Sequence, residues 1–103
     1  MIARIAIVGH RYHGLLVDNS NDSFTEWIEP DKRAATRLAH RIRQRTIHGV
    51  VLILADLTHG VSVPIVTACR LMGVRLTACK KRSQTQIRSA LDALVSDRKE
   101  LPL

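Results

Sequence analysis

The sequence predicts an α/β fold, a three-layer α/β/α sandwich whose mainly parallel sheet has about four strands. Short aliphatic runs alternate with longer amphipathic stretches, as strands joined by crossover helices do. Apolar residues make up 46% of the chain and aromatic residues only 3%, a composition typical of buried parallel strands covered by helices. Within the 103 residues we expect a single domain over residues 1–96 and a C-terminal tail over residues 97–103.

The first half of the chain contains two predicted strands and one predicted helix. Arg4–Gly9 is an aliphatic run that ends in glycine, and Phe24–Glu29 is a second short strand. Residues 10–23 are polar and rich in Asn, Asp and Ser, which predicts a loop. This connection is barely long enough for a crossover helix, so a bare loop and a hairpin both remain open.

A helix is predicted to begin at Pro30 or Asp31, because proline and acidic residues favour the first turn of a helix. It runs to about Gln44 or Thr46, and its core-facing residues recur at helical spacing. These residues are Ala35, Leu38, Ala39 and Ile42.

The second half of the chain continues the alternation. Residues 49–55 are the most hydrophobic run and predict a central buried strand. A helix over Thr58–Leu71, stopped at Gly73, leads to a strand over Val74–Cys79. Ser83 then caps a last helix that ends near residue 95.

Positive charge is unevenly distributed along the chain. The formal net charge is +7, and residues 32–103 hold fourteen Lys or Arg and four Asp or Glu. Between Lys32 and Leu91 the single carboxylate is Asp56. A field of this sign favours anionic partners. The alternative is a basic surface that serves solubility alone.

The carboxyl ends of the predicted parallel strands should meet at one edge of the sheet, where such sheets bind ligands. Two of the segments at this edge lead into helix N-termini, whose free N–H groups attract anions. We therefore predict a site for a nucleotide or another phosphorylated small molecule. Its candidate residues are Gly9, His10, Arg11, Asp56, Thr58, His59, Gly60, Lys80, Lys81, Arg82 and Ser83.

Asp56 has two interpretations. It could bind a ribose or base edge, or pair with His10 or His59 and hold a tautomer. It could also fix a loop by accepting backbone N–H bonds. A lone acid among so many bases favours the functional interpretation slightly. For Ser83, the competing interpretation is a plain N-cap beside solvated bases.

Two other functions compete with small-molecule binding. Four arginines recur every four residues on the predicted helix and could follow a nucleic-acid backbone. They are Arg33, Arg37, Arg41 and Arg45. A small phosphate-ester hydrolase or transferase would instead use His59 with Asp56. Because no common nucleotide-binding or nucleophile motif is present, we expect a binding protein with a sensing or sequestering role rather than an enzyme.

The sequence also predicts several absences. No apolar run approaches the roughly 18 residues that span a bilayer, so we expect no membrane partner. Two cysteines do not make a disulfide scaffold, which favours a cytoplasmic location. No recognised zinc spacing is present, and we expect neither a metal nor a cofactor. An open sheet of this size favours a homodimer or a higher homo-oligomer.

From Gly49 onward the chain resembles the bacterial DUF2325 family, small Rossmann-like domains of unassigned function. The resemblance rests on an apolar strand that ends in Asp56, then Thr58-His59, then Ala68-Cys69-Arg70. Gly73 and the basic turn Arg82-Ser83 complete it, and residues 5–11 also look like the family's first strand and glycine turn. Residues 10–29 depart from the pattern. The resemblance implies a parallel Rossmann-like sheet and a ligand site at Asp56, Thr58 and His59.

Overall fold

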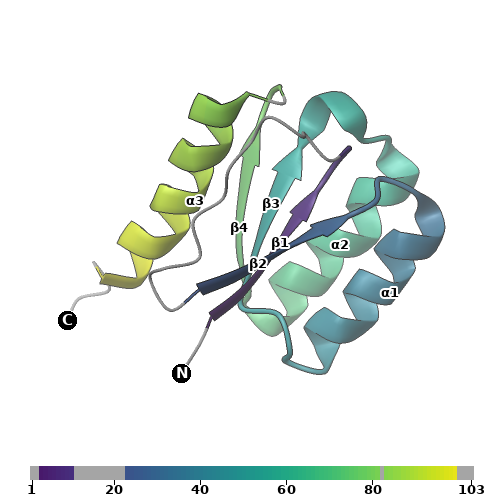
Figure 1. Ribbon diagram of the computed structural model, residues 1–103. Coiled ribbons are helices and arrows are strands. Elements are labelled where there is room, and N and C mark those ends of the chain that lie inside the picture. Colours follow the sequence, from purple (N-terminus) through teal and green to yellow (C-terminus); the bar gives the residue numbers. More distant parts are fainter. Residues whose placement is uncertain (1–2, 11–22, 82, 100–103) are drawn as a thin grey trace.

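The computed structural model describes residues 3–10, 23–81 and 83–99. A four-stranded, all-parallel sheet with the order β2-β1-β3-β4 forms its centre. The strands are β1 (Ala3–Val8), β2 (Ser23–Ile28), β3 (Gly49–Ile53) and β4 (Arg75–Cys79). Helices α1 (Lys32–Arg43) and α2 (His59–Met72) cover one face, and α3 (Gln84–Lys99) covers the other (Figure 1). The predicted Rossmann-like α/β sandwich is therefore confirmed.

The pairing of β1 with β2 decides the topology that the sequence left open. The two strands run parallel, from Ala3 opposite Ser23 to Val8 opposite Ile28. A hairpin would make neighbouring strands antiparallel, so the hairpin alternative is wrong. Residues 11–22 of the connection lie outside the described residues.

The core has two parts, one on each face of the sheet. Toward α1 and α2 the strands contribute Ala6, Val8, Val50 and Leu52. Toward α3 they contribute Ile5, Ile7, Val51 and Ile53. Since both faces are covered, residues 5–8 of β1 and all of β3 are continuous apolar runs without the alternation of a half-exposed strand.

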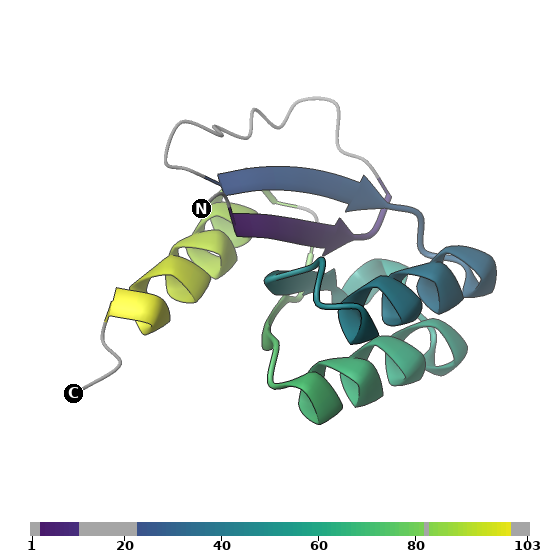
Figure 2. The same ribbon diagram turned by 90° about the horizontal axis from the view of Figure 1, so that it is seen from below.

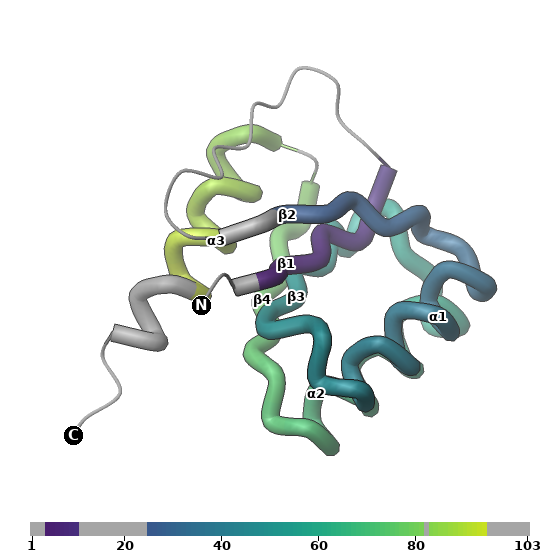
Figure 3. Tube along the Cα trace, turned by 60° about the horizontal axis from the view of Figure 1, so that its bottom comes forward, coloured from purple at the N-terminus to yellow at the C-terminus, as the bar shows by residue number. Residues whose placement is uncertain are grey.

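Helices α1 and α2 lie side by side and pack against each other (Figure 2). Each leads from the carboxyl end of one strand to the amino end of the next, so both N-termini lie at the carboxyl edge of the sheet. Figure 3 shows the same pair on one side of the strands, with α3 on the other. The layout brings the helix N-termini to the edge where α/β sheets bind ligands.

Two polar contacts orient α1. Asp31 is its N-cap, and the Asp31 carboxylate accepts a hydrogen bond from the Ala34 N–H at 2.8 Å. Arg41 donates two hydrogen bonds, of 2.9 and 2.8 Å, to the Glu26 carboxylate on β2. These bonds hold the pKa of Glu26 below its ordinary value. The ion pair attaches the last turn of α1 to an edge strand.

Two element ends differ from the sequence prediction. β3 stops at Ile53, two residues early, because Leu54–Asp56 form a single 3-10 turn that redirects the chain toward α2. The apolar side chain of Leu54 is 48% exposed, so hydrophobicity alone overestimated the strand. At the C-terminal end, α3 continues to Lys99, about one turn beyond the predicted end near residue 95.

Helix α1 ends at Arg43 in a left-handed turn. The Arg45 N–H donates to the Ile42 carbonyl at 3.0 Å, and the Thr46 N–H donates to the Arg41 carbonyl at 3.1 Å. This Schellman pattern needs a left-handed residue, a position usually held by glycine. Here Arg45 adopts it, with φ of 63°, so Arg45 is not on the helix as predicted.

Replacing this arginine by glycine should stabilise the protein. We expect Arg45→Gly to raise the free energy of unfolding by about 1 kcal/mol, because glycine adopts the left-handed conformation without strain. Urea unfolding monitored by Trp27 fluorescence measures the change.

The matched control is Gly73→Ala at the end of α2. Gly73 has φ of 68°, and a Cβ built there meets nothing within 4 Å. Its loss of about 1 kcal/mol would therefore report backbone strain alone. A destabilised Arg45→Gly variant would contradict this account and show that the arginine side chain outweighs the strain.

Candidate functional site

The strand order reverses direction between β1 and β3. From β1 the chain goes to β2 on one side, and it then crosses to β3 and β4 on the other. In open α/β sheets, ligands bind at this switch point, outside the carboxyl ends of the two strands. The residues that follow β1 and β3 here are Gly9 and His10, and the Leu54–Asp56 turn.

Gly9 allows the ends of β1 and β3 to come unusually close. A Cβ built on Gly9 would lie 2.8 Å from Cδ1 and 2.9 Å from Cβ of Ile53, and 3.0 Å from Oδ2 of Asp56. The Cβ of Ile53 belongs to a buried strand and cannot move aside. Glycine is therefore required by space at this position.

Asp56 ties the two strand ends together. Its Oδ2 accepts a hydrogen bond from the backbone N–H of His10 at 2.9 Å. This is the loop-fixing role that the sequence left as the second interpretation of Asp56. The carboxylate thereby positions the backbone of His10, and His10 is exposed at the switch point.

The N-terminus of α2 is exposed and carries no acidic residue. Thr58 is its N-cap but makes no side-chain capping hydrogen bond, and the first turn contains no Asp or Glu. His59 and Gly60 are exposed beside it. The positive end of the helix dipole thus faces outward without a compensating charge from its own helix.

Lys32, at the start of α1, lies against this N-terminus. A Cβ built on Gly60 would be 2.9 Å from Cε and 3.8 Å from Nζ of Lys32. Sequence reasoning missed Lys32 as a site residue, because 28 positions separate it from Gly60. The available signal was that consecutive crossover helices on one face place their N-termini together.

The segment after β4 is organised by a glutamine. Oε1 of Gln86 accepts hydrogen bonds from the N–H groups of Lys80 and Lys81, both at 3.1 Å. Ser83 accepts a long hydrogen bond of 3.4 Å from the Gln86 N–H, which is an N-cap contact. Two backbone donors at this end are therefore already occupied, while the Lys80 and Lys81 residues are exposed.

The structure places the predicted site residues in two groups. Gly9, His10 and Asp56 are in direct contact, and Thr58, His59 and Gly60 form the exposed start of α2. The second group, Lys80, Lys81 and Ser83, lies at the start of α3 on the other face of the sheet. The backbone carbonyl of Lys80 accepts a 3.1 Å hydrogen bond from the Ala55 N–H. This bond links the two groups. Arg11 and Arg82 lie outside the described residues.

Both cysteines are buried thiols. Burial raises the pKa of Cys69 to about 11. Burial, and then the charge of Asp56, raise the pKa of Cys79 above its ordinary value. A protonated thiol is a poor nucleophile and a poor metal ligand. Over the described residues, no group of three or more His, Cys, Asp or Glu could hold a metal ion, and no helix there is long and apolar enough to cross a membrane.

The four arginines of the predicted basic ridge do not share one environment. Arg33 and Arg37 are exposed on α1. Arg41 is half-buried in its ion pair with Glu26, and Arg45 lies beyond the helix. Successive steps of four residues drift around a helix, which carries the row toward β2 rather than along the outer surface.

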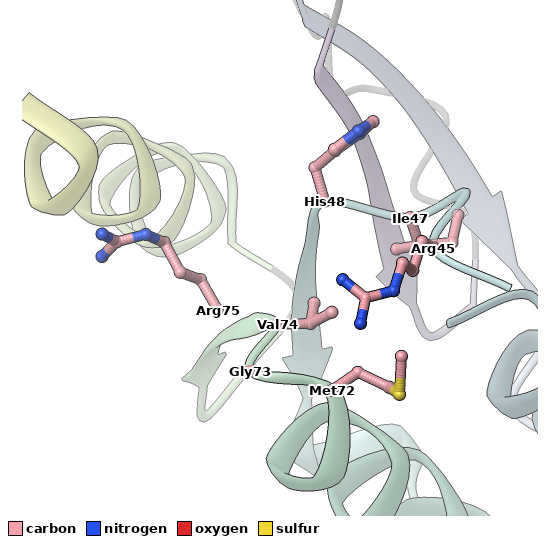
Figure 4. A pocket seen from close by; sticks show the side chains of 7 residues that line it. All are labelled: Arg45, Ile47, His48, Met72, Gly73, Val74 and Arg75. Atoms are coloured by element: carbon pink, nitrogen blue, oxygen red, sulfur yellow. The ribbon is translucent and has the colours of Figure 1, made fainter. Parts of the chain in front are cut away.

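A hollow of about 250 Å³ lies at the opposite, amino edge of the sheet. Arg45 extends across it toward Met72 and Val74, whereas the side chains of His48 and Arg75 point away (Figure 4). Nδ1 of His48 is engaged by the Arg4 N–H at 2.9 Å. Because its polar groups do not converge, this hollow lacks the arrangement of a specific ligand site.

Comparison of the chain with family models, with curated protein sequences and with solved structures finds no match. The resemblance to the DUF2325 family therefore stays a prediction.

Asp56 should matter for stability. We expect Asp56→Ala to lower the free energy of unfolding by about 1–2 kcal/mol, because the His10 N–H loses a charged acceptor. Asp56→Asn, which keeps an acceptor oxygen, should lose less. Urea unfolding of wild type and the two variants measures the order of their free energies of unfolding. Equal stability of wild type and Asp56→Ala would show that the Asp56–His10 hydrogen bond does not stabilise the fold.

Stability should also fall at alkaline pH because of Cys69. Burial raises the pKa of its thiol from an ordinary value of 9.0, which applies to the unfolded chain, to about 11 in the folded protein. Between these values the unfolded chain binds fewer protons, so the free energy of unfolding decreases as pH rises. Urea unfolding between pH 8 and 10.5 measures the slope. Cys69→Ala is the control, since its free energy of unfolding should decrease less over this pH range. An equal decrease in the variant would contradict the role given to the Cys69 thiol.

Proposed function

We propose that the protein binds a phosphorylated small molecule, with a nucleotide as the best candidate, at the switch point between β1 and β3. It acts as a binding protein that senses or sequesters this ligand. One observation carries the proposal: the end of the Lys32 side chain lies against Gly60, at a helix N-terminus that has no capping side chain.

The electrostatics of this contact support an anionic ligand. A helix N-terminus carries the equivalent of about half a positive charge. An ammonium group beside it is unfavourable, and neither α1 nor α2 has an acidic residue in its first turn. An anion between Lys32 and the first N–H groups of α2 would reverse the sign of the interaction.

Two nearby carboxylates accept hydrogen bonds from backbone N–H groups outside the start of α2. Asp31 caps α1 through the Ala34 N–H, and Asp56 accepts from the His10 N–H. Glu29, after β2, is exposed. Lys32 and the N-terminus of α2 together place positive charge at the position where phosphate groups bind in folds of this class.

Binding without turnover is supported by the roles of the reactive groups. The Asp56 carboxylate is held by the His10 backbone N–H, and Cys79 is kept protonated by burial and by Asp56. His59 is the exposed imidazole that a phosphate-ester hydrolase would use. Release of inorganic phosphate from ATP or ADP, abolished by His59→Ala, would support that alternative.

Two substitutions at the contact should weaken ligand binding in different ways. Lys32→Met removes the charge and should weaken ADP binding about tenfold, the size expected for one charge-assisted contact. Gly60→Ala forces the end of Lys32 aside while improving helix propensity by up to about 1 kcal/mol. It should therefore bind ADP more weakly and yet unfold at a higher urea concentration.

Isothermal titration calorimetry with ADP, ATP and inorganic phosphate measures these affinities. Arg37→Met is the matched control, since it removes one positive charge from the exposed surface of the same helix. Equal affinities for wild type, Lys32→Met and Arg37→Met would contradict the proposed site.

A further inference from the structure

Helices α1 and α2 form a layer whose charges have one sign. Neither helix contains Asp or Glu, and their basic residues are Lys32, Arg33, Arg37, Arg41, Arg43 and Arg70. Helix α3, on the other face of the sheet, mixes Arg88, Arg98 and Lys99 with Asp92 and Asp97. The two faces of the sheet are therefore covered by helices of different electrostatic character.

The outer surface of α1 carries a basic row that differs from the one read from the sequence. With 3.6 residues per turn, Arg33 and Arg37 lie opposite the middle of the buried stripe that Ala35, Leu38, Ala39 and Ile42 form. Arg43 lies on the flank toward α2, and all three arginines are exposed. At 1.5 Å per residue the row is about 15 Å long.

Neither stability nor solubility explains this row. Like charges four residues apart on a helix, as at Arg33 and Arg37, are destabilising. Surfaces that serve solubility mix both signs. By contrast, the charge of Arg41 is compensated within the fold by its ion pair with Glu26. A polyanionic partner would provide the same compensation for the outer row.

The side chains of α1 and α2 limit which class of partner this layer can bind. Single-stranded nucleic acid binds by stacking bases on aromatic residues, and α1 and α2 contain no Phe, Tyr or Trp. The apolar side of α1 is buried in the core, so it has no apolar side chains to insert into a membrane. Val63 and Leu71 are exposed on α2 but lie two turns apart. A second copy would bring like charges together.

We propose that the outer surface of α1, through Arg33, Arg37 and Arg43, binds the phosphate backbone of duplex nucleic acid without reading its sequence. A row of cations along a rigid helix suits regularly spaced phosphates, and each contact releases bound counterions. This surface is distinct from the switch point, and the inference does not depend on the proposed small-molecule site.

The test measures the salt dependence of binding to a fluorescein-labelled 20-base-pair DNA duplex of arbitrary sequence, by fluorescence anisotropy. Each phosphate contact contributes about −0.9 to the slope of log K against log salt. The triple variant Arg33→Gln/Arg37→Gln/Arg43→Gln should lose about 2 to 3 units of slope. It should keep its affinity for ADP, which separates this surface from the switch-point site.

The matched control, Arg88→Gln/Arg98→Gln/Lys99→Gln, removes three positive charges from α3. It should keep the wild-type slope, and circular dichroism should show both variants folded. An equal loss of slope in the two variants would overturn the proposal, because net charge alone would then explain binding. Tighter binding to a single-stranded 20-mer, or to vesicles with 30% phosphatidylserine, would also overturn it.

Discussion

The close approach of β1 to β3 is the constraint on which the rest of the structure depends. Gly9 has no room for a side chain beside Ile53, and the Asp56 carboxylate holds the next residue through the His10 N–H. These contacts fix the two strand ends at the point where the strand order reverses. They also set where the 3-10 turn releases the chain into α2, and so where the exposed N-terminus of α2 meets Lys32.

Positive potential then accumulates at one edge and over one layer of the molecule. The N-termini of α1 and α2 meet at the carboxyl edge, and Lys32 adds a formal charge there. Along α1, Arg41 is paired with Glu26, whereas Arg33, Arg37 and Arg43 are exposed. The two features differ in scale. The first is a compact site between two strand ends, suited to one phosphate group, and the second is a surface about 15 Å long, suited to a polymer.

The fold was predictable because hydrophobic periodicity marks parallel strands and their crossover helices clearly. All four strands and all three helices were expected close to their observed positions. The ends of elements were less predictable. The turn at Leu54–Asp56 is joined to the segment after β4 by the Ala55–Lys80 hydrogen bond, and Arg45 adopts a left-handed conformation usually held by glycine. In the site, the candidate strand-end segments followed from topology alone. The Lys32 contact did not, because it depends on how two helices pack, and the role of Asp56 required the position of the His10 N–H.

The central claim is that the switch point between β1 and β3 binds phosphate groups. The most direct measurement is a titration of ¹⁵N-labelled protein with ADP, followed by amide chemical shifts. The account predicts that the largest shifts occur at Gly9, His10, His59 and Gly60, and that they saturate. Saturating shifts confined to the amino-edge hollow or to the outer surface of α1, with the switch-point amides unchanged, would contradict it.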